Sequence, residues 1–117
     1  METMAPSGSE KSGNTKRIPA SKRWCFTLNN YGEDEWLQIL NSLKEKGNFI
    51  MGREVGEQGT PHIQGYVEFH TKCRPLECIK NKRIHWEKAK GNQEDNIKYC
   101  SKDKDFETNL ELPYDPL

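Results

Sequence analysis

The sequence lacks the features that define several large classes of protein. It contains no run of eighteen apolar residues, which a membrane-spanning helix would need. Its first residues have no apolar stretch of the kind that a secretory signal carries. No GxxxxGK[ST] phosphate loop and no internal repeat are present. We therefore expect neither a membrane helix, nor a P-loop nucleotide hydrolase, nor a repeat protein.

Paired cysteine motifs are also missing. The four cysteines are Cys25, Cys73, Cys78 and Cys100, and no two of them form a CxxC pair. Without a secretion signal, we expect reduced thiols in a cytosolic or nuclear protein. The spacing of Cys73, Cys78 and His85 leaves open a small zinc-binding regulatory domain, although zinc sites are usually built on closer pairs.

The whole chain has no net charge, but its basic and acidic residues are concentrated in different segments. The 117 residues carry 18 basic and 18 acidic groups, while residues 72–104 carry ten basic and five acidic ones. Residues 105–117 carry four acidic groups and no basic one. The basic segment fits either a solvated surface or a nucleic-acid contact.

The length suits one domain, with polar ends on either side. Residues 1–21 have the composition of a disordered tail, and the basic pairs near residues 16–17 and 22–23 resemble a weak nuclear-import signal. Residues 105–117 contain Pro113 and Pro116 and are predicted to be a linker. The domain is therefore expected at 22–104.

Hydrophobic periodicity predicts an α+β layout. Strands are expected at 23–28, 48–54, 62–70 and 83–87, where apolar residues alternate. A helix is expected at 33–46, with Trp36, Leu37, Leu40 and Leu43 as its apolar stripe and Gly47 as its C-cap. A short helix should start at Pro75, and Asn92 should cap a helix through residue 102. Helices on a mainly antiparallel sheet are expected.

The first strand and the strand at 83–87 should each send their large apolar side chains to one face. The residues concerned are Trp24, Phe26 and Leu28 in the first strand, with Ile84 and Trp86 in the other.

One face of the strand at 62–70 carries polar side chains that could bind a metal ion. Ile63, Gly65, Val67 and Phe69 form the apolar face, so His62 and Gln64 share the other face, which has one aromatic side chain, Tyr66. A hairpin closed by residues 55–61 would put Glu54 opposite His62. Imidazole, carboxylate and amide suit Mn²⁺ or Mg²⁺ and leave positions for water and phosphate; an exposed strand edge is the alternative.

The last predicted helix carries a candidate nucleophile. At 100° per residue, Ile97 and Cys100 face one way, while Tyr99 lies on another side with Lys98 and Lys102. A phenol with a pKa near 10 attacks poorly at neutral pH unless cations stabilise its anion or the phosphate. Tyr99 is therefore either a surface tyrosine or a phenol nucleophile flanked by two lysines.

Three motifs in order, "CFTLNN" (25–30), "PHIQGY" (61–66) and "YCSK" (99–102), resemble the replication-initiator endonuclease domain of circoviruses and related single-stranded DNA viruses. The stretches "GREVGEQGT" and "HWEKAKG" extend the resemblance over roughly residues 22–104. The wider family is that of the HUH (His-hydrophobic-His) endonucleases. Here Gln64 stands where the second histidine would be, as in the circovirus branch, so the metal preference is open.

The resemblance implies a five-stranded antiparallel sheet with flanking helices. It implies a divalent ion, Mn²⁺ or Mg²⁺, on Glu54, His62 and Gln64, with Glu57 as a competitor for Glu54. It implies that Tyr99 nicks single-stranded DNA at an origin hairpin loop, forms a 5′-phosphotyrosine link and starts rolling-circle replication. A helicase domain would follow in a full-length protein, and the resemblance also allows oligomerisation and work in the host nucleus.

Contacts with DNA phosphates are expected from the basic segment. Asn29 and Asn30 could hydrogen-bond DNA or simply end the first strand, and a structural role with some DNA contact is expected of them. The candidates are Asn29, Asn30, Lys80, Lys82, Arg83, Lys88 and Lys90. The rival reading is a non-catalytic module like the RNA-recognition motif, which also has helices behind an antiparallel sheet. Such modules expose stacking aromatics in an RNP1-type run, and no such run occurs here.

Overall fold

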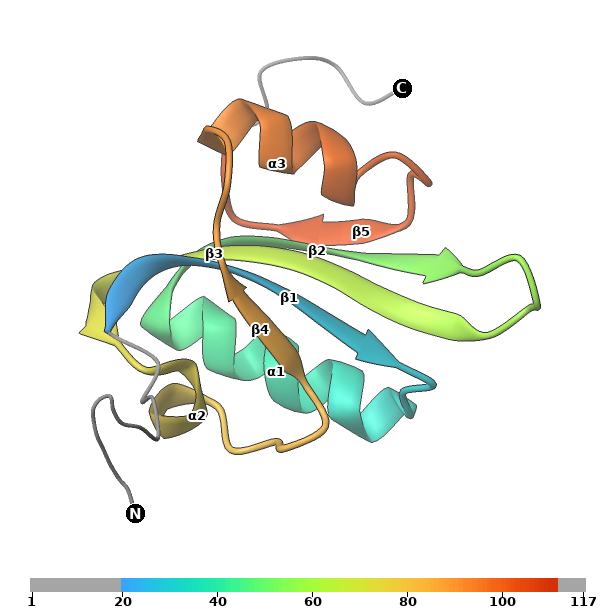
Figure 1. Cartoon of the computed structure of the whole chain (residues 1–117), viewed down its shortest axis with the longest axis horizontal. Helices are drawn as coiled ribbons and strands as arrows, with labels where there is room; N and C mark the ends of the chain where they lie inside the picture. The colour runs from blue at the N-terminus through green and yellow to red at the C-terminus, as the bar shows by residue number, and fades with distance from the viewer. Residues whose placement is uncertain (1–19, 112–117) are drawn as a thin grey trace, which may run out of the picture.

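The computed structural model of the chain describes residues 20–111 (Figure 1). Most of the tail predicted at 1–21 and the residues after Glu111 lie outside this range. The elements, in chain order, are β1 (Ser21–Asn29), α1 (Glu33–Lys46), β2 (Gly47–Val55), β3 (Pro61–Cys73), α2 (Pro75–Cys78), β4 (His85–Lys88), α3 (Gln93–Cys100) and β5 (Phe106–Thr108).

The five strands form one antiparallel sheet in the order β4-β1-β3-β2-β5. Helices α1 and α2 lie on one face, and α3 lies on the other, above the sheet in Figure 1. The α+β class and the five-stranded antiparallel sheet are therefore confirmed. In the part of the chain that the structure describes, no helix is long and apolar enough to cross a membrane.

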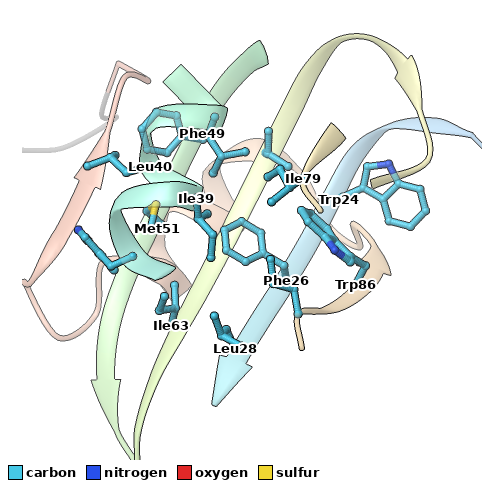
Figure 2. Packing of buried hydrophobic residues seen from close by; sticks show 14 of the residues in the cluster. Trp24, Phe26, Leu28, Ile39, Leu40, Phe49, Met51, Ile63, Ile79 and Trp86 are labelled. Carbon is cyan, nitrogen blue, oxygen red and sulfur yellow. The ribbon is translucent and has the colours of Figure 1, made fainter. Parts of the chain in front are cut away.

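The main core lies between the sheet and α1, as the strand alternation predicts. Trp24, Phe26 and Leu28 are at most 2% exposed, and Trp86 packs on Phe26 with ring centres 5.1 Å apart (Figure 2). The end of the Phe26 ring also lies against Gly65, its partner in β3, where a Cβ atom would come within 2.0 Å of the ring. Gly65 is thus needed for the close approach of an aromatic ring to the sheet.

Helix α1 buries a slightly different stripe from the one predicted. Trp36, Leu40 and Leu43 are buried, but Leu37 is 52% exposed and Ile39 is fully buried instead. The reason is helical geometry: Leu37 is turned by about 100° from Trp36, whereas Ile39 is turned by only about 60° in the other direction and lies on the same side as Leu43. The prediction of Leu37 in the core was wrong.

The linker prediction was wrong for residues 106–108. Strand β5 pairs with β2, with Gly52 opposite Phe106 and Ile50 opposite Thr108. The Asn109 side chain continues the pairing, since it accepts a bond from the Phe49 amide and donates one to the Gly47 carbonyl. The strand is too short for a periodic pattern, so the prolines beyond it dominated the sequence signal.

Helix α3 covers the second face of the sheet. As predicted, Asn92 caps it by accepting a bond from the Asp95 amide at 2.8 Å, and Ile97 and Cys100 are buried. They form a small cluster with Ile50 and Tyr66. Tyr66, the one aromatic on the side of β3 that carries His62 and Gln64, is therefore fully buried under the helix.

Candidate active site

The predicted metal ligands meet on the face of the sheet that carries α3. Two rows of paired residues cross this face. In the first, Asn29 of β1 lies opposite His62 of β3, which lies opposite Glu54 of β2. In the second, Thr27, Gln64 and Gly52 follow in the same strand order. The predicted pairing of Glu54 with His62 is confirmed.

Glu54 is a buried carboxylate with charged or ionisable neighbours on both oxygens. Only 8% of the residue is exposed. Its Oε1 atom lies 2.9 Å from His62 Nε2, and its Oε2 atom lies 3.1 Å from Lys102 Nζ. Although Oε2 is in ion-pair range, it accepts no well-aligned hydrogen bond within the described residues. Lys102 is thus the cation that faces this buried oxygen, and a divalent ion on Glu54 would have to share or replace it.

Gln64 completes the candidate ligand set. It shares a strand face with His62 two residues away, and its Oε1 atom accepts a 3.3 Å bond from Thr27 Oγ1. Carboxylate, imidazole and amide oxygen fit Mn²⁺ or Mg²⁺ better than zinc. Across residues 20–111, no three His, Cys, Asp or Glu side chains gather as a metal site, so the candidate set depends on the amide of Gln64.

Glu57, the competing ligand, is exposed in the turn between β2 and β3. It borders a hollow of about 430 Å³ together with His62 and Asn29. Its exposure contrasts with the burial of Glu54 opposite His62, so the geometry favours Glu54 as the anionic ligand.

Tyr99 is the exposed aromatic side chain of the described chain, with half of its surface accessible. It lies in the last turn of α3, and Lys102 Nζ is 4.0 Å from the centre of its ring. Burial works against the Lys102 charge, but the interaction with the Glu54 carboxylate outweighs it and raises the Lys102 pKa. Lys102 is thus a stable cation between the phenol and the carboxylate, whereas the exposed Lys98 has no carboxylate partner in the described chain.

A groove of about 510 Å³ runs beside this site. Gln64 and Tyr99 both border it, so the phenol and one candidate ligand open onto a common space. Thr27, Lys88 and Lys90 also line it. Within the described part of the chain, the exposed side chains of these two lysines have no ion pair.

The other predicted DNA contacts are distributed around the sheet. Lys80 and Lys82 are exposed in the segment between α2 and β4. Asn29 borders the hollow next to His62, and Asn30 has a left-handed backbone with φ of 55°. The structure thus brings Asn29, Lys88 and Lys90 to the site. Lys80 and Lys82 do not line the groove or the hollow beside it.

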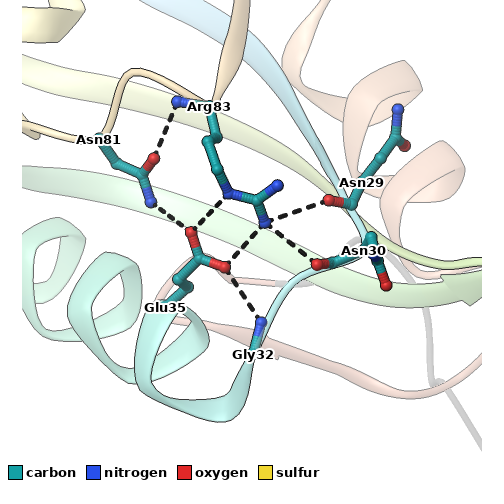
Figure 3. A network of polar contacts seen from close by, with 6 residues as sticks. All are labelled: Asn29, Asn30, Gly32, Glu35, Asn81 and Arg83. Carbon is teal, nitrogen blue, oxygen red and sulfur yellow. Dashed lines mark hydrogen bonds and ion pairs between the residues drawn. The ribbon is translucent and has the colours of Figure 1, made fainter.

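Arg83 differs from the other predicted contacts because its guanidinium already has partners inside the protein (Figure 3). It binds both carboxylate oxygens of Glu35, at 3.0 and 2.9 Å. It also donates to the carbonyl oxygens of Asn29 and Asn30. Arg83 therefore ties the end of β1 to the first turn of α1, a structural role that the sequence did not indicate.

The network lowers the pKa of Glu35 to about 2. The bond from Arg83 contributes most, followed by bonds from the Asn81 side chain and from the Gly32 amide. Glu35 thus remains ionised well below the usual range of carboxyl groups.

Three residues of the site were missed by the sequence analysis. The Thr27 hydroxyl, the His85 side chain and Gly52 all adjoin the ligand rows or the groove. Thr27 was detectable in principle, because Cys25, Thr27 and Asn29 alternate with the core residues of β1. No local pattern in the sequence marks Gly52, because its role depends on the backbone of Cys100, which is distant in the sequence.

Comparison with known proteins identifies relatives that are all viral replication proteins. The family model described as "Putative viral replication protein" matches residues 21–103. A replication-associated protein of pigeon circovirus is 47% identical over 93% of this chain and 36% of its own length. Those of canary circovirus and porcine circovirus 2 are 50% and 41% identical over 76% and 81% of this chain. The chain spans about a third of the length of these curated relatives.

Proposed function

Because the chain belongs to this family of viral replication proteins, we propose that it nicks and joins single-stranded DNA to initiate replication of a circular viral genome. The nick would occur at an origin hairpin loop and would start rolling-circle synthesis from the free 3′ end. The observation that carries the proposal is the exposed phenol of Tyr99 beside Lys102, whose other neighbour is the buried carboxylate of Glu54.

The reaction would be a transfer of the DNA phosphate to the phenol. Tyr99 Oη forms a bond to phosphorus, the bond from phosphorus to the 3′-oxygen breaks, and the phenol proton ends on that oxygen. The products are a 5′-phosphotyrosine link and a 3′-hydroxyl. The reverse attack by a 3′-hydroxyl rejoins strands without ATP, because the phosphodiester energy is kept in the link.

The Lys102 ammonium would stabilise negative charge on the Tyr99 phenol and on the DNA phosphate that it attacks. It lies over the Tyr99 ring, where it stabilises negative charge as the phenol loses its proton. Its raised pKa keeps it charged, so it acts as a cation and not as the base. Lys98, one turn earlier and exposed, would steer the phosphate backbone.

Glu54, His62 and Gln64 would hold a divalent cation, Mn²⁺ or Mg²⁺. When bound, such an ion supplies charge neutralisation at a non-bridging phosphate oxygen. Glu54 contributes the only anionic oxygens of the set, and its burial opposite His62 supports this assignment. His62 would bind the ion through an unprotonated ring nitrogen.

The DNA would enter along the groove between α3 and β4. Lys88 and Lys90 border this groove with exposed, unpaired ammonium groups in the described chain, which suits phosphate contacts. An RNA-recognition-type module has less support, because the central strands expose no aromatic and Tyr66 is buried. Work in the host nucleus and assembly of a longer protein are further proposals that rest on the family resemblance.

The direct test compares two carboxylates on the same hairpin. Glu54→Gln keeps the shape of the side chain but removes the anionic ligand, so we expect Mn²⁺ binding and nicking of an origin-loop oligonucleotide to fall steeply. Glu57→Gln, in the exposed turn, is the matched control and should retain both. Full nicking in excess chelator, or equal loss in both variants, would contradict the proposed ligand set.

A further inference from the structure

Gly52 occupies the point where the helix that carries Tyr99 meets the sheet. It lies in β2 between Ile50 and Glu54 on the α3 face, paired with Gln64 of β3 and Phe106 of β5. A Cβ atom on Gly52 would lie 2.1 Å from the backbone carbonyl oxygen of Cys100, the residue after Tyr99.

The contact that blocks a side chain at Gly52 is made by main chain, which cannot rotate away. The same Cβ atom would also lie 3.3 Å from the Cys100 carbonyl carbon and 3.6 Å from the Asp105 carbonyl oxygen. Moving the first contact from 2.1 Å to the 3.4 Å of ordinary van der Waals contact takes about 1.3 Å. That shift would fall on the end of α3, between the phenol and Lys102.

We propose that Gly52 is a positioning residue for the reaction: the absence of its side chain seats the last turn of α3 on the sheet and so sets Tyr99 against Glu54, His62 and Gln64. This inference rests on the proposed function of Tyr99. It explains why a buried position in the middle of a strand, where a larger residue would normally pack, holds glycine.

An alanine at Gly52 should disturb the geometry of the site more than the stability of the fold. A reacting group displaced by about 1 Å can lose about 100-fold in rate. The residues of the main core lie on the other face of the sheet, so Gly52→Ala leaves their packing in place. The Gly52 backbone is not in the left-handed region, so alanine brings no backbone strain beyond the contact with Cys100.

Gly47 provides a matched control in the same strand. A Cβ atom there would lie 2.4 Å from the Glu68 carbonyl oxygen, a comparable main-chain clash. Gly47 pairs with Phe69 at the opposite end of β2 from Glu54. Gly47→Ala therefore reports the general cost of crowding this strand, without moving the helix end that carries Tyr99.

The experiment measures three quantities for the wild type and both variants. The first is the single-turnover rate of adduct formation at saturating origin-loop oligonucleotide with Mn²⁺. The second is the dissociation constant for that oligonucleotide, and the third is the alkylation rate of Cys100, followed by peptide mass spectrometry. Cys100 is 4% exposed, and burial raises its thiol pKa to about 12, so it should react slowly in the wild type.

For Gly52→Ala, we expect the rate to fall by about 10- to 100-fold while DNA affinity changes less than about threefold. Cys100 should alkylate faster, because the lifted helix end exposes it. Gly47→Ala should change neither the single-turnover rate nor Cys100 labelling. Equal rate losses in the two variants, or a wild-type rate in Gly52→Ala, would overturn the proposal.

A second variant covers the case in which Gly52→Ala does not fold. Ile97→Ala removes the buried side chain that holds α3 on the second cluster, and it should likewise speed Cys100 labelling and slow the reaction. Faster labelling with an unchanged rate would overturn the inference. Absence of any adduct in the wild type would instead refute the proposed function, whereas the labelling contrast between Gly52→Ala and Gly47→Ala would still report on the seating of α3.

Discussion

A cation bound at Glu54 would compete with Lys102 for the same carboxylate oxygen. Lys102 Nζ lies 3.1 Å from Glu54 Oε2, the oxygen that lacks a well-aligned hydrogen bond. A metal ion on Glu54 would displace this ammonium or be repelled by it. Lys102→Met, which keeps most of the aliphatic chain and removes the charge, should therefore strengthen binding of Mn²⁺.

The magnitude follows from the distance and the exposure of the pair. Two unit charges at this separation interact by about 5 kcal/mol at an effective dielectric constant of about 20. The Lys102 side chain is 43% exposed, so solvent screens the pair strongly and about 1 kcal/mol is a realistic value. That free energy corresponds to a gain in Mn²⁺ affinity of about fivefold.

Calorimetric titration of the DNA-free protein with Mn²⁺ at pH 7 measures this gain. Lys98→Met is the matched control, because it removes one positive charge from the same helix at an exposed position and should change the affinity little. Lys102→Met should also nick more slowly, since the phenol loses its cation. Unchanged or weaker Mn²⁺ binding in Lys102→Met would refute competition for Glu54.

Three further outcomes are expected. Arg83→Met should lower the free energy of unfolding above about pH 4, where the carboxyl groups of the unfolded chain are ionised. In urea unfolding, the difference from the wild type should shrink as the pH falls towards the lowered Glu35 pKa of about 2. A difference that does not change with pH would contradict this role. Lys88→Ala and Lys90→Ala should each weaken binding to all single strands alike and reduce the salt slope by about one unit, as fluorescence anisotropy would show, whereas loss for one base sequence only would mean base reading. Phe26→Ala should lower the free energy of unfolding by about 3–5 kcal/mol, measured by chemical denaturation, and a loss below about 1 kcal/mol would contradict its place in the core.

Local patterns in the sequence were sufficient for most of the fold. Alternation in β1 identified Trp24, Phe26 and Leu28 as core, and the turn length between β2 and β3 predicted that Glu54 lies opposite His62. Both inferences depend only on strand geometry and short-range pairing, which the sequence states directly.

What the sequence did not reveal depends on distant contacts. The ion pair of Arg83 with Glu35 and the contact of Lys102 with Glu54 each join residues 48 positions apart. Gly52 is significant because of the Cys100 carbonyl, and Tyr66 is buried because α3 crosses β3. Such contacts follow from the packing of elements against one another, so no local period or spacing announces them.

If Tyr99 is the nucleophile, it becomes covalently joined to DNA, and an intact-mass measurement detects this adduct. The protein is incubated with a circovirus origin-loop oligonucleotide and Mn²⁺, beside a Tyr99→Phe variant and a sample with excess chelator. We predict a mass gain equal to the 3′ cleavage fragment with its 5′-phosphate, less one water, mapped to Tyr99 and absent from both controls. No adduct in the wild type, an adduct on another residue, or an adduct in Tyr99→Phe would contradict the claim.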